Sequence, residues 1–351
     1  MKAIKLVSIF LVLGLLGSCE KEELPSIQNE NESVNSPKKI KANSFISSND
    51  NLNFTLQSSS NNMGGFAGQS MTQFKGNLWL VGGDNNHTAP WSSSSQVWAS
   101  RNGTDWKLIT KSPFAERRNH SLIVYKNKLW LIGGIKNNGE ILSDIWNSSD
   151  GINWNQVNSL NPLQDIGQNS SVVFNERLFV FRGNGTENQE VWSSSNGSNW
   201  RLETDNAFPV RSHYKTLLFN GSIYVIGGWL RGGLHTNEIW ASRNGRNWYK
   251  KSPASDIFAP RIDHSVTVYK GKVWVIGGQT SNTSGNRIFH GDIWYSDNMK
   301  YWTRYENRHP FQEGLHSHVI LPYENKLWVF GGYNPDSSMA DIITENIWSI
   351  N

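Results

Sequence analysis

The sequence predicts an all-β fold, a ring of six four-stranded antiparallel sheets, and three recurring patterns support it. The first is an apolar segment that ends in Gly-Gly or a variant of it, and the other two are tryptophans at fixed places after it. The apolar segments are 78–83, 129–134, 178–183, 223–228, 273–278 and 327–332. A period of about 50 residues is typical of β-propellers, in which each repeat forms one blade. We therefore expect a six-bladed β-propeller over residues 50–351.

A pair of tryptophans marks the third and fourth strands of each repeat. The first members are Trp98, Trp146, Trp192, Trp240, Trp294 and Trp348, and in the first five repeats a second Trp follows eight residues later. Asn-Gly or Asp-Gly, such as Asn102-Gly103, lies between the two in four repeats. These dipeptides favour type I′ turns, in which both central residues have positive φ. We expect a tight hairpin that joins the two outer strands of each blade.

The N-terminal part of this region predicts how the ring closes. The last repeat ends shortly after Trp348 and has no fourth strand of its own. Residues 50–58 resemble an isolated fourth strand, with Asn53-Phe54 where other repeats have Asn-Trp. We expect this strand to complete the last blade, because such a pairing protects the sheet edges. The long apolar runs of the strands fit sheets that are covered on both faces.

The repeats resemble the kelch family of propellers. An Arg-x-x-His-Ser start, a Gly-Gly after the second strand and an aromatic residue on the third strand carry the resemblance over residues 50–351. It implies that the loops before strand one and after strand two emerge on one face around the central axis, where ligands bind. Because one fold supports many activities, the function has to be inferred from the residues on that face.

The composition excludes several classes of function. The net charge of the 351-residue chain is +4, and no dense basic stripe predicts a nucleic-acid partner. Cys19 is the only cysteine, which excludes an internal disulfide, an iron–sulfur cluster and the Tyr–Cys copper site of galactose oxidase. We expect no cofactor and no metal site. The alternative is zinc, bound by the imidazoles of His316 and His318 on one face of a strand.

Residues 1–19 are typical of an export signal. Lys2 and Lys5 accompany an apolar segment, 4–16, which is too short to span a bilayer of about 30 Å. Leu16-Gly17-Ser18-Cys19 resembles a bacterial lipobox, in which the peptide is cut before the cysteine and the thiol is acylated. An ordinary signal peptide that holds a cysteine is the alternative.

The segment after Cys19 predicts the cellular location of the domain. The acidic residues Glu20, Glu22 and Glu23 resemble the surface-export signal of Bacteroidetes lipoproteins, and residues 20–49 form a Ser- and Asn-rich flexible tether. We therefore expect an outer-membrane lipoprotein, exposed on the cell surface and anchored by a lipid such as palmitate on Cys19.

Alignment of the blades on the first residue of the innermost strand places polar residues around the axis. The candidate ligand-binding residues are Arg117, His120, Arg211, His213, Tyr214, Trp229, Arg231, Arg261, Asp263, His264 and His318. Three arginines that face one axis repel each other unless an acidic group joins them, and Asp263 is the only carboxylate at the aligned positions. Such a cluster favours a carboxylate or sulfate ligand. The alternative is that these Arg and His side chains bond to neighbouring loops.

Three further residues depart from the repeat. Trp91 and Trp229 follow the second strands of their blades on the ligand face, where an exposed indole would stack against a sugar ring. The alternative is that each fills a gap between blades. Arg182 replaces the first glycine of a Gly-Gly pair, and either points to the axis or reflects a loosened third blade.

These observations favour a propeller that binds an acidic carbohydrate on its axial face. Two enzyme classes remain open: a sialic acid mutarotase, and a polysaccharide lyase in which a cation neutralises a uronate and His or Tyr acts as base and acid. The residues for the lyase roles are Arg211, His213, Tyr214, Arg261 and His264. Ordinary glycosidases need two carboxylates, which the aligned ring does not offer. A platform that binds another surface protein is the third alternative.

Overall fold

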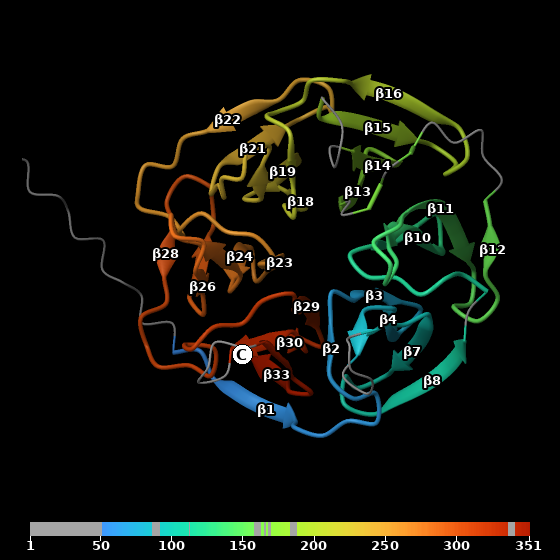
Figure 1. Cartoon of the computed structure of the whole chain (residues 1–351), viewed down its shortest axis with the longest axis horizontal. Helices are drawn as coiled ribbons and strands as arrows, with labels where there is room; N and C mark the ends of the chain where they lie inside the picture. Colours follow the sequence, from blue (N-terminus) through green and yellow to red (C-terminus); the bar gives the residue numbers. More distant parts are fainter. Residues whose placement is uncertain are drawn as a thin grey trace, which may run out of the picture. The chain divides into compact units, whose positions relative to one another are not determined.

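The computed structural model describes residues 51–85, 92–111, 113–157, 163–164, 166–167, 170–182, 188–335 and 341–351, and this part of the chain consists of strands and loops. Four-stranded antiparallel sheets are arranged around a central axis, and the chain visits them in order (Figure 1). No helix long and apolar enough to cross a membrane occurs in the described ranges. The predicted export signal and tether, Cys19 included, lie outside the described residues.

Six sheets within the described residues have four strands each, and we call them blades 1–6 in chain order. Blade 1 is β3 (Ser70–Phe74), β4 (Asn77–Val81), β7 (Gln96–Ser100) and β8 (Trp106–Lys111), and blade 2 is β9 (Ser121–Tyr125), β10 (Lys128–Ile135), β11 (Ile141–Ser148) and β12 (Asn155–Gln156). Blade 3 is β13 (Ser170–Phe174), β14 (Arg177–Arg182), β15 (Glu190–Ser194) and β16 (Trp200–Thr204), and blade 4 is β18 (Lys215–Phe219), β19 (Ser222–Ile226), β21 (Ile239–Ser242) and β22 (Tyr249–Lys251). Blade 5 is β23 (Ser265–Tyr269), β24 (Lys272–Ile276), β27 (Ile293–Ser296) and β28 (Thr303–Arg304). Blade 6 is β29 (Val319–Tyr323), β30 (Lys326–Phe330), β33 (Ile347–Ile350) and β1 (Phe54–Ser58).

The outer strand of blade 6 comes from the N-terminal side of the domain. β1 pairs antiparallel with β33, with Phe54 opposite Ile350 and Leu56 opposite Trp348. The innermost strands contact one another in the sequence β3, β9, β13, β18, β23 and β29, and β29 in turn contacts β3. The two ends of the domain therefore meet in one sheet.

The main core of the described residues consists of six layers that lie between neighbouring blades, and a small further cluster joins Ala67, Tyr333 and Ile343. Each layer is a cluster of buried side chains contributed by two consecutive blades, and one of these clusters joins blades 6 and 1. The second strands are buried over most of their length, as in β19, where all five residues are buried. This arrangement explains why the strands show apolar runs rather than alternation, since both faces of each sheet are covered.

The turns between the third and fourth strands differ from the predicted type I′ hairpins. Gly103 has φ +81°, but Asn102 is not in the left-handed region, so only one of the two positions has positive φ. The Asn102 side chain instead accepts hydrogen bonds from the amides of Thr104 and Asp105, and Ser100 Oγ accepts one from Gly103. The prediction of a type I′ turn is wrong because the side-chain carbonyl of Asn replaces a backbone turn.

These glycines also serve as contact points between blades. A Cβ at Gly151 of blade 2 would lie 2.1 Å from the ring of Trp79 in blade 1, and one at Gly197 of blade 3 would lie 2.2 Å from Trp130 in blade 2. The second-strand tryptophan of one blade thus packs directly on the turn of the next. This contact explains why the turn glycine and the second-strand tryptophan recur together in the repeats.

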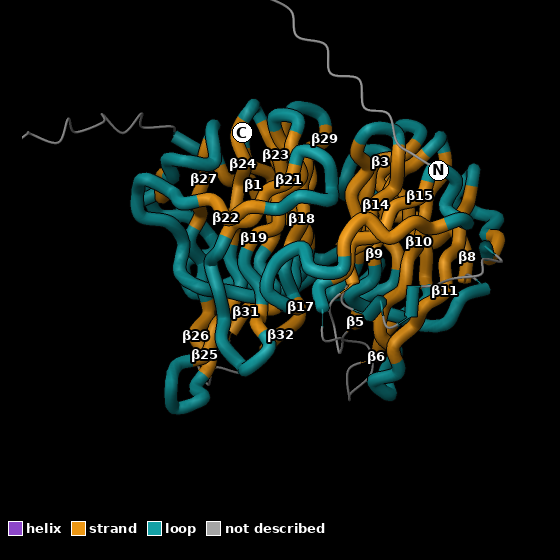
Figure 2. Tube along the Cα trace, turned by 90° about the horizontal axis from the view of Figure 1, so that it is seen from above, coloured by secondary structure: helices purple, strands orange, loops and turns teal. Residues whose placement is uncertain are grey.

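Additional short strands project from one side of the ring, at the bottom of Figure 2. They are β2 (Phe66–Ala67), β5 (Asp84–Asn85), β6 (Ser92–Ser93), β17 (Arg211–Ser212), β20 (Trp229–Leu230), β25 (Gln279–Ser281), β26 (Arg287–Phe289), β31 (Tyr333–Pro335) and β32 (Asp341–Ile343). They belong to the loops before the first strand and after the second strand of the blades. We call this side the axial face.

Candidate functional site

In five blades the residue two positions before the innermost strand has positive φ. Asn119, His213, Asp263 and Ser317 have φ between +54° and +55°, and Gly68 has φ +63°. Backbone hydrogen bonds join several of these residues around the axis, and we call this group of residues the belt. The amide of Asn119 donates to the carbonyl of Gly68 at 2.8 Å, Gly68 donates to Ser317 at 3.0 Å, and Ser317 donates to Asp263 at 2.8 Å. This arrangement requires a left-handed backbone conformation at these residues, which Asn and Asp tolerate better than most residues do.

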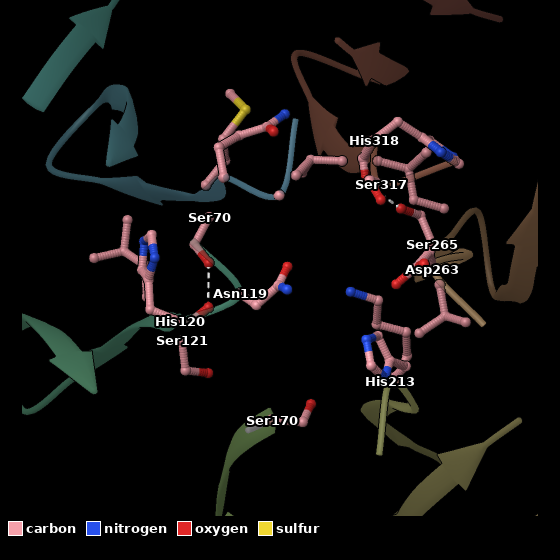
Figure 3. Close-up of a pocket in the computed structure, with 18 of the residues that line it drawn as sticks. Ser70, Asn119, His120, Ser121, Ser170, His213, Asp263, Ser265, Ser317 and His318 are labelled. Atoms are coloured by element: carbon pink, nitrogen blue, oxygen red, sulfur yellow. Dashed lines mark hydrogen bonds between the residues drawn. The ribbon is translucent and has the colours of Figure 1, made fainter. Parts of the chain in front are cut away.

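A cavity of about 230 Å³ lies at this belt, on the axis (Figure 3). Asn119, His213 and Asp263 point into it from different blades. Its lining residues are Gly68, Gln69, Ser70, Met71, Asn119, His120, Ser121, Leu122, Ser170, His213, Tyr214, Lys215, Asp263, Ser265, Val266, Ser317, His318, Val319 and Ile320. Of the candidate residues from the sequence, it brings together His120, His213, Tyr214, Asp263 and His318.

The charges in the cavity are concentrated on blades 4 and 5. Burial alone would raise the pKa of Asp263, but His213, a 2.8 Å hydrogen bond from Gln279 Nε2 and the charges of His316 and Lys215 hold it below its usual value. Burial lowers the pKa of Lys215, and Asp263 opposes this shift. Burial also lowers the pKa of His213, again against the effect of Asp263. An ionised carboxylate, a lysine and a neutral imidazole therefore stand together.

Arg117, Arg211 and Arg261 do not line the cavity, and the prediction that they form an axial anion pocket is wrong. Each guanidinium is fully buried within its own blade and bound to a carboxylate. Arg117 pairs with Asp144 at 2.8 Å, Arg211 with Glu238 at 2.6 Å, and Arg261 with Asp292 at 2.6 Å. Arg261 also donates to the carbonyl of Gly277, and its guanidinium lies over the ring of Phe258. The mutual repulsion inferred from the alignment is removed by one acidic partner per arginine.

Arg182 also forms an ion pair within its own blade, although it occupies a different position in the repeat. It binds Glu190 at 2.8 Å, and Glu190 also accepts a hydrogen bond from Trp192. In the arginine-containing blades 2, 4 and 5, the carboxylate likewise stands two residues before a Trp whose indole donates to it. Blade 3 has Ile166 where these blades have arginine, so Arg182 supplies the missing cation. Arg182 therefore does not belong to the cavity.

His120, His264 and His318 stack against the glycines of the preceding blade. A Cβ at Gly82 would lie 2.8 Å from the ring of His120, and one at Gly227 would lie 2.8 Å from the ring of His264. Burial, with help from the charge of Arg117, lowers the pKa of His120 to about 3, and burial with Lys215 and His316 lowers that of His318 to about 3. His264 is buried and outside the cavity lining. These imidazoles are neutral packing elements near physiological pH.

Tyr214 also bridges two blades. Its hydroxyl donates to the carbonyl of Phe181 in blade 3 at 3.3 Å and accepts from Gln189 at the same distance. Burial raises the pKa of Tyr214. A phenol that is held in this way and stays protonated is poorly placed to act as a base.

Trp229 lies on the axial face next to the cavity. Its side chain is 44% exposed and stacks against His235, with ring centroids 6.2 Å apart and planes 10° from parallel. His213 of the cavity lies at the same centroid distance on a tilted plane. Arg231, two residues on, is exposed. Trp91, the other loop tryptophan, lies outside the described residues.

The alignment missed Lys215, which lines the cavity, and also Gln279, Arg287 and His316, which are linked to the cavity residue Asp263 through Gln279. Arg287 Nε donates to Gln279 Oε1 at 2.7 Å, and its Nη2 lies 3.2 Å from His316 Nε2. His316 in turn stacks between Phe289 and Tyr333. Gln279 and Arg287 lie between the second and third strands of blade 5, where the loops differ in length and the repeats cannot be aligned. Lys215, one position beyond the aligned residues, was visible in the sequence.

Neither imidazole of the zinc alternative has a metal-binding neighbourhood. His316 is engaged by Arg287 and by aromatic rings, and His318 packs against glycine. Within the ranges that the structure describes, no group of three or more His, Cys, Asp or Glu side chains is arranged to hold a metal ion.

A β-propeller with a polar cavity on its axis is the class that this fold and site define. The chain belongs to the DUF6242 beta propeller domain family, whose model matches residues 48–348. The family match and the sheet arrangement confirm the all-β propeller that the sequence predicts.

Sequence similarity to two other proteins covers shorter segments of the chain. The chain is 29% identical to beta-scruin of Limulus polyphemus over 128 residues, which is 36% of this chain and 13% of that protein. It is 27% identical over 94 residues to the leucine-zipper-like transcriptional regulator 1 homolog of Drosophila melanogaster, which is 25% of this chain and 9% of that protein. The matched segments thus span a small part of these relatives.

A solved structure described as "Structure of YjhT" superposes with a TM-score of 0.63 and 14% identity, over 80% of this chain and 94% of that one. A similarity at this level of identity shows the shared fold alone.

Proposed function

We propose that this chain is a six-bladed, kelch-type propeller that binds a carbohydrate on its axial face. The observation that carries the proposal is the exposed indole of Trp229, stacked on His235 and placed beside the His213–Asp263 edge of the cavity. An exposed, rigidly held Trp offers an apolar face to the C–H side of a sugar ring. The neighbouring carboxylate, amide and hydroxyl groups suit sugar hydroxyls, which both donate and accept hydrogen bonds.

The experiment compares two aromatic residues of equal exposure. Trp229→Ala should weaken binding of neutral and acidic sugars alike by about tenfold, because stacking does not depend on charge. Tyr249 on the outer strand β22, also 44% exposed, is the matched control, and Tyr249→Ala should leave binding unchanged. Calorimetry against neutral, uronic and sialic mono- and oligosaccharides gives the affinities. Equal affinities for wild type and Trp229→Ala would exclude this indole from the site.

An enzyme that acts on acidic sugars is the second candidate, and the cluster of Lys215, Asp263 and His213 favours it. A lysine whose pKa is lowered, beside an ionised carboxylate, is an arrangement that catalytic sites share. Product analysis on the same calorimetry samples distinguishes this candidate from binding alone. Appearance of an unsaturated uronate, or faster exchange between sialic acid anomers, would assign a lyase or a mutarotase.

We further propose that the propeller is held at the outer face of the outer membrane by a lipid on Cys19. The lipobox-like segment and the acidic residues after it support this proposal. Cys19→Ser should move the protein from the membrane to the soluble fraction and abolish labelling by palmitate. Membrane association that survives the substitution would refute the anchor.

A further inference from the structure

Lys215 replaces a serine in the repeat. The first residue of the innermost strand is Ser70, Ser121, Ser170 and Ser265 in blades 1, 2, 3 and 5. These serines connect neighbouring blades: Ser70 Oγ donates to the carbonyl of His120, and Ser265 Oγ to the carbonyl of His318. Blade 4 has a lysine at this position instead. A residue that breaks a structural repeat in the axial cavity, at the loss of an inter-blade bond, is a candidate for a functional role.

The ammonium of Lys215 has no hydrogen bond and no ion pair with any residue of the described ranges. Its side chain is nevertheless half-buried and lines the cavity. Its charge helps to lower the pKa of His213, His264 and His318, which belong to three different blades. An ammonium group that lines a cavity without a direct hydrogen bond or ion pair is free to bind an anionic ligand, and such charge-assisted contacts are strong.

Asp263 limits which anion fits. Its Oδ2 accepts a hydrogen bond from Gln279, which is itself bound by Arg287, so these contacts hold the carboxylate in the cavity wall. A ligand that is charged on every side, such as sulfate or phosphate, would be repelled by this carboxylate. A ligand with one carboxylate and several hydroxyls avoids the conflict, because hydroxyls donate to Asp263.

We propose that Lys215 binds the carboxylate of a single sugar acid, such as a uronic or sialic acid residue, while Asp263 and Asn119 bind its hydroxyls. This inference rests on the carbohydrate proposal and names the substrate class of that site. The cavity volume of about 230 Å³ is below the range of about 300–1,000 Å³ typical of sites for drug-sized ligands, and therefore suits one sugar ring. The rest of a longer glycan would extend toward Trp229.

The test compares glucuronate with glucose, and includes lactate as a hydroxy acid that is not a sugar. Wild type should bind glucuronate about tenfold to a hundredfold more tightly than glucose, as expected for one charge-assisted contact. Lys215→Ser, which introduces the residue of four other blades and should fold normally, should remove this difference. Lys215→Arg should keep most of it. Lys326→Ser, at a half-buried lysine outside the cavity lining, is the matched control and should bind like wild type.

The outcomes separate this inference from the carbohydrate proposal. Equal binding of glucose and glucuronate, unchanged in Lys215→Ser, would overturn the role of Lys215 and leave the carbohydrate proposal standing. Binding of lactate but of neither sugar, lost in Lys215→Ser, would overturn the sugar as ligand while keeping Lys215 as a carboxylate site. No binding of any of the three compounds would overturn both.

Discussion

The arginines show how a residue can fit a predicted pattern and perform a different task. Arg117, Arg211 and Arg261 recur at one alignment position, yet each guanidinium points into its own blade and not to the axis. An alignment identifies equivalent positions, but the direction of a long side chain depends on where its acidic partner lies. The energetic role of these residues is therefore to satisfy buried polar groups, namely the Gly-Gly carbonyls and the carboxylates.

This assignment predicts that an arginine substitution affects stability before it affects binding. Arg261→Ala should lower the free energy of unfolding by about 3–5 kcal/mol, because it leaves the largely buried Asp292 without its partner. Arg304→Ala is the control, since Arg304 lies 3.8 Å from Glu306 in an exposed pair, and it should cost less than about 1 kcal/mol. Urea unfolding measures both. If Arg261→Ala weakens sugar binding without a loss of stability, the structural role is refuted.

The sequence contained a signal for these ion pairs. Asp144, Glu238 and Asp292 stand two residues before a Trp in the blades that have the arginine, whereas Gln96 and Asn346 stand there in blades 1 and 6, which lack it. Joint variation of two positions indicates contact between them, and here it assigns the arginines to ion pairs within their blades rather than to the cavity. No such pattern in the sequence indicates the contact of Gln279 with Asp263, because this contact depends on the path of an irregular loop.

At the scale of the strand, β1 also contacts residues outside its own sheet. Phe54 packs against Tyr305, His309 and Phe311, which follow the last strand of blade 5, with ring centroids 5.8–5.9 Å away. The number and order of the strands could be predicted because each repeat shows its own apolar run and its own turn. The side-chain geometry of the turns could not, because Asn serves a type I′ turn and an Asx turn equally well.

The role of β1 can be tested by a pair of substitutions in one strand. Phe54→Ala should destabilise the domain by about 2–4 kcal/mol, since the ring is in contact with three others at the junction of blades 5 and 6. Leu56→Ala, at a side chain that is 43% exposed, should change stability by less than about 0.5 kcal/mol. Thermal unfolding followed by tryptophan fluorescence reports both variants. Equal effects would mean that β1 does not contribute through this junction.

For the whole molecule, the buried histidines set the response to acid. Burial lowers the pKa of His120 and His318 to about 3 and, with Arg261 and Arg304 respectively, lowers the pKa of His290 and His309 to about 4. In the unfolded chain the imidazoles have a pKa near 6.5. The unfolded state therefore binds protons first as the pH falls, and stability that is complete above about pH 6.5 is lost below it.

This linkage predicts a loss of stability well above the range in which carboxylates titrate. Between pH 7.5 and pH 5, each such histidine should contribute about 2 kcal/mol to the decrease in unfolding free energy. His318→Gln introduces the residue type that blade 1 has at the same position, Gln69, and should reduce the decrease by the share of one histidine. Urea unfolding at the two pH values measures it. The same decrease in His318→Gln and wild type would show that this imidazole is not neutral and buried.

The pairing of β1 with β33 makes the domain a candidate for circular permutation. The amide of Asn351 donates to the carbonyl of Asn53 at 3.2 Å, so the two strands approach each other as the third and fourth strands of the other blades do. A short linker at this point would make blade 6 continuous, and the chain could then be opened at the exposed turn of another blade, such as the one around Asn244. A permuted chain of this kind should form the same cavity, because none of the residues that line it depends on where the chain starts.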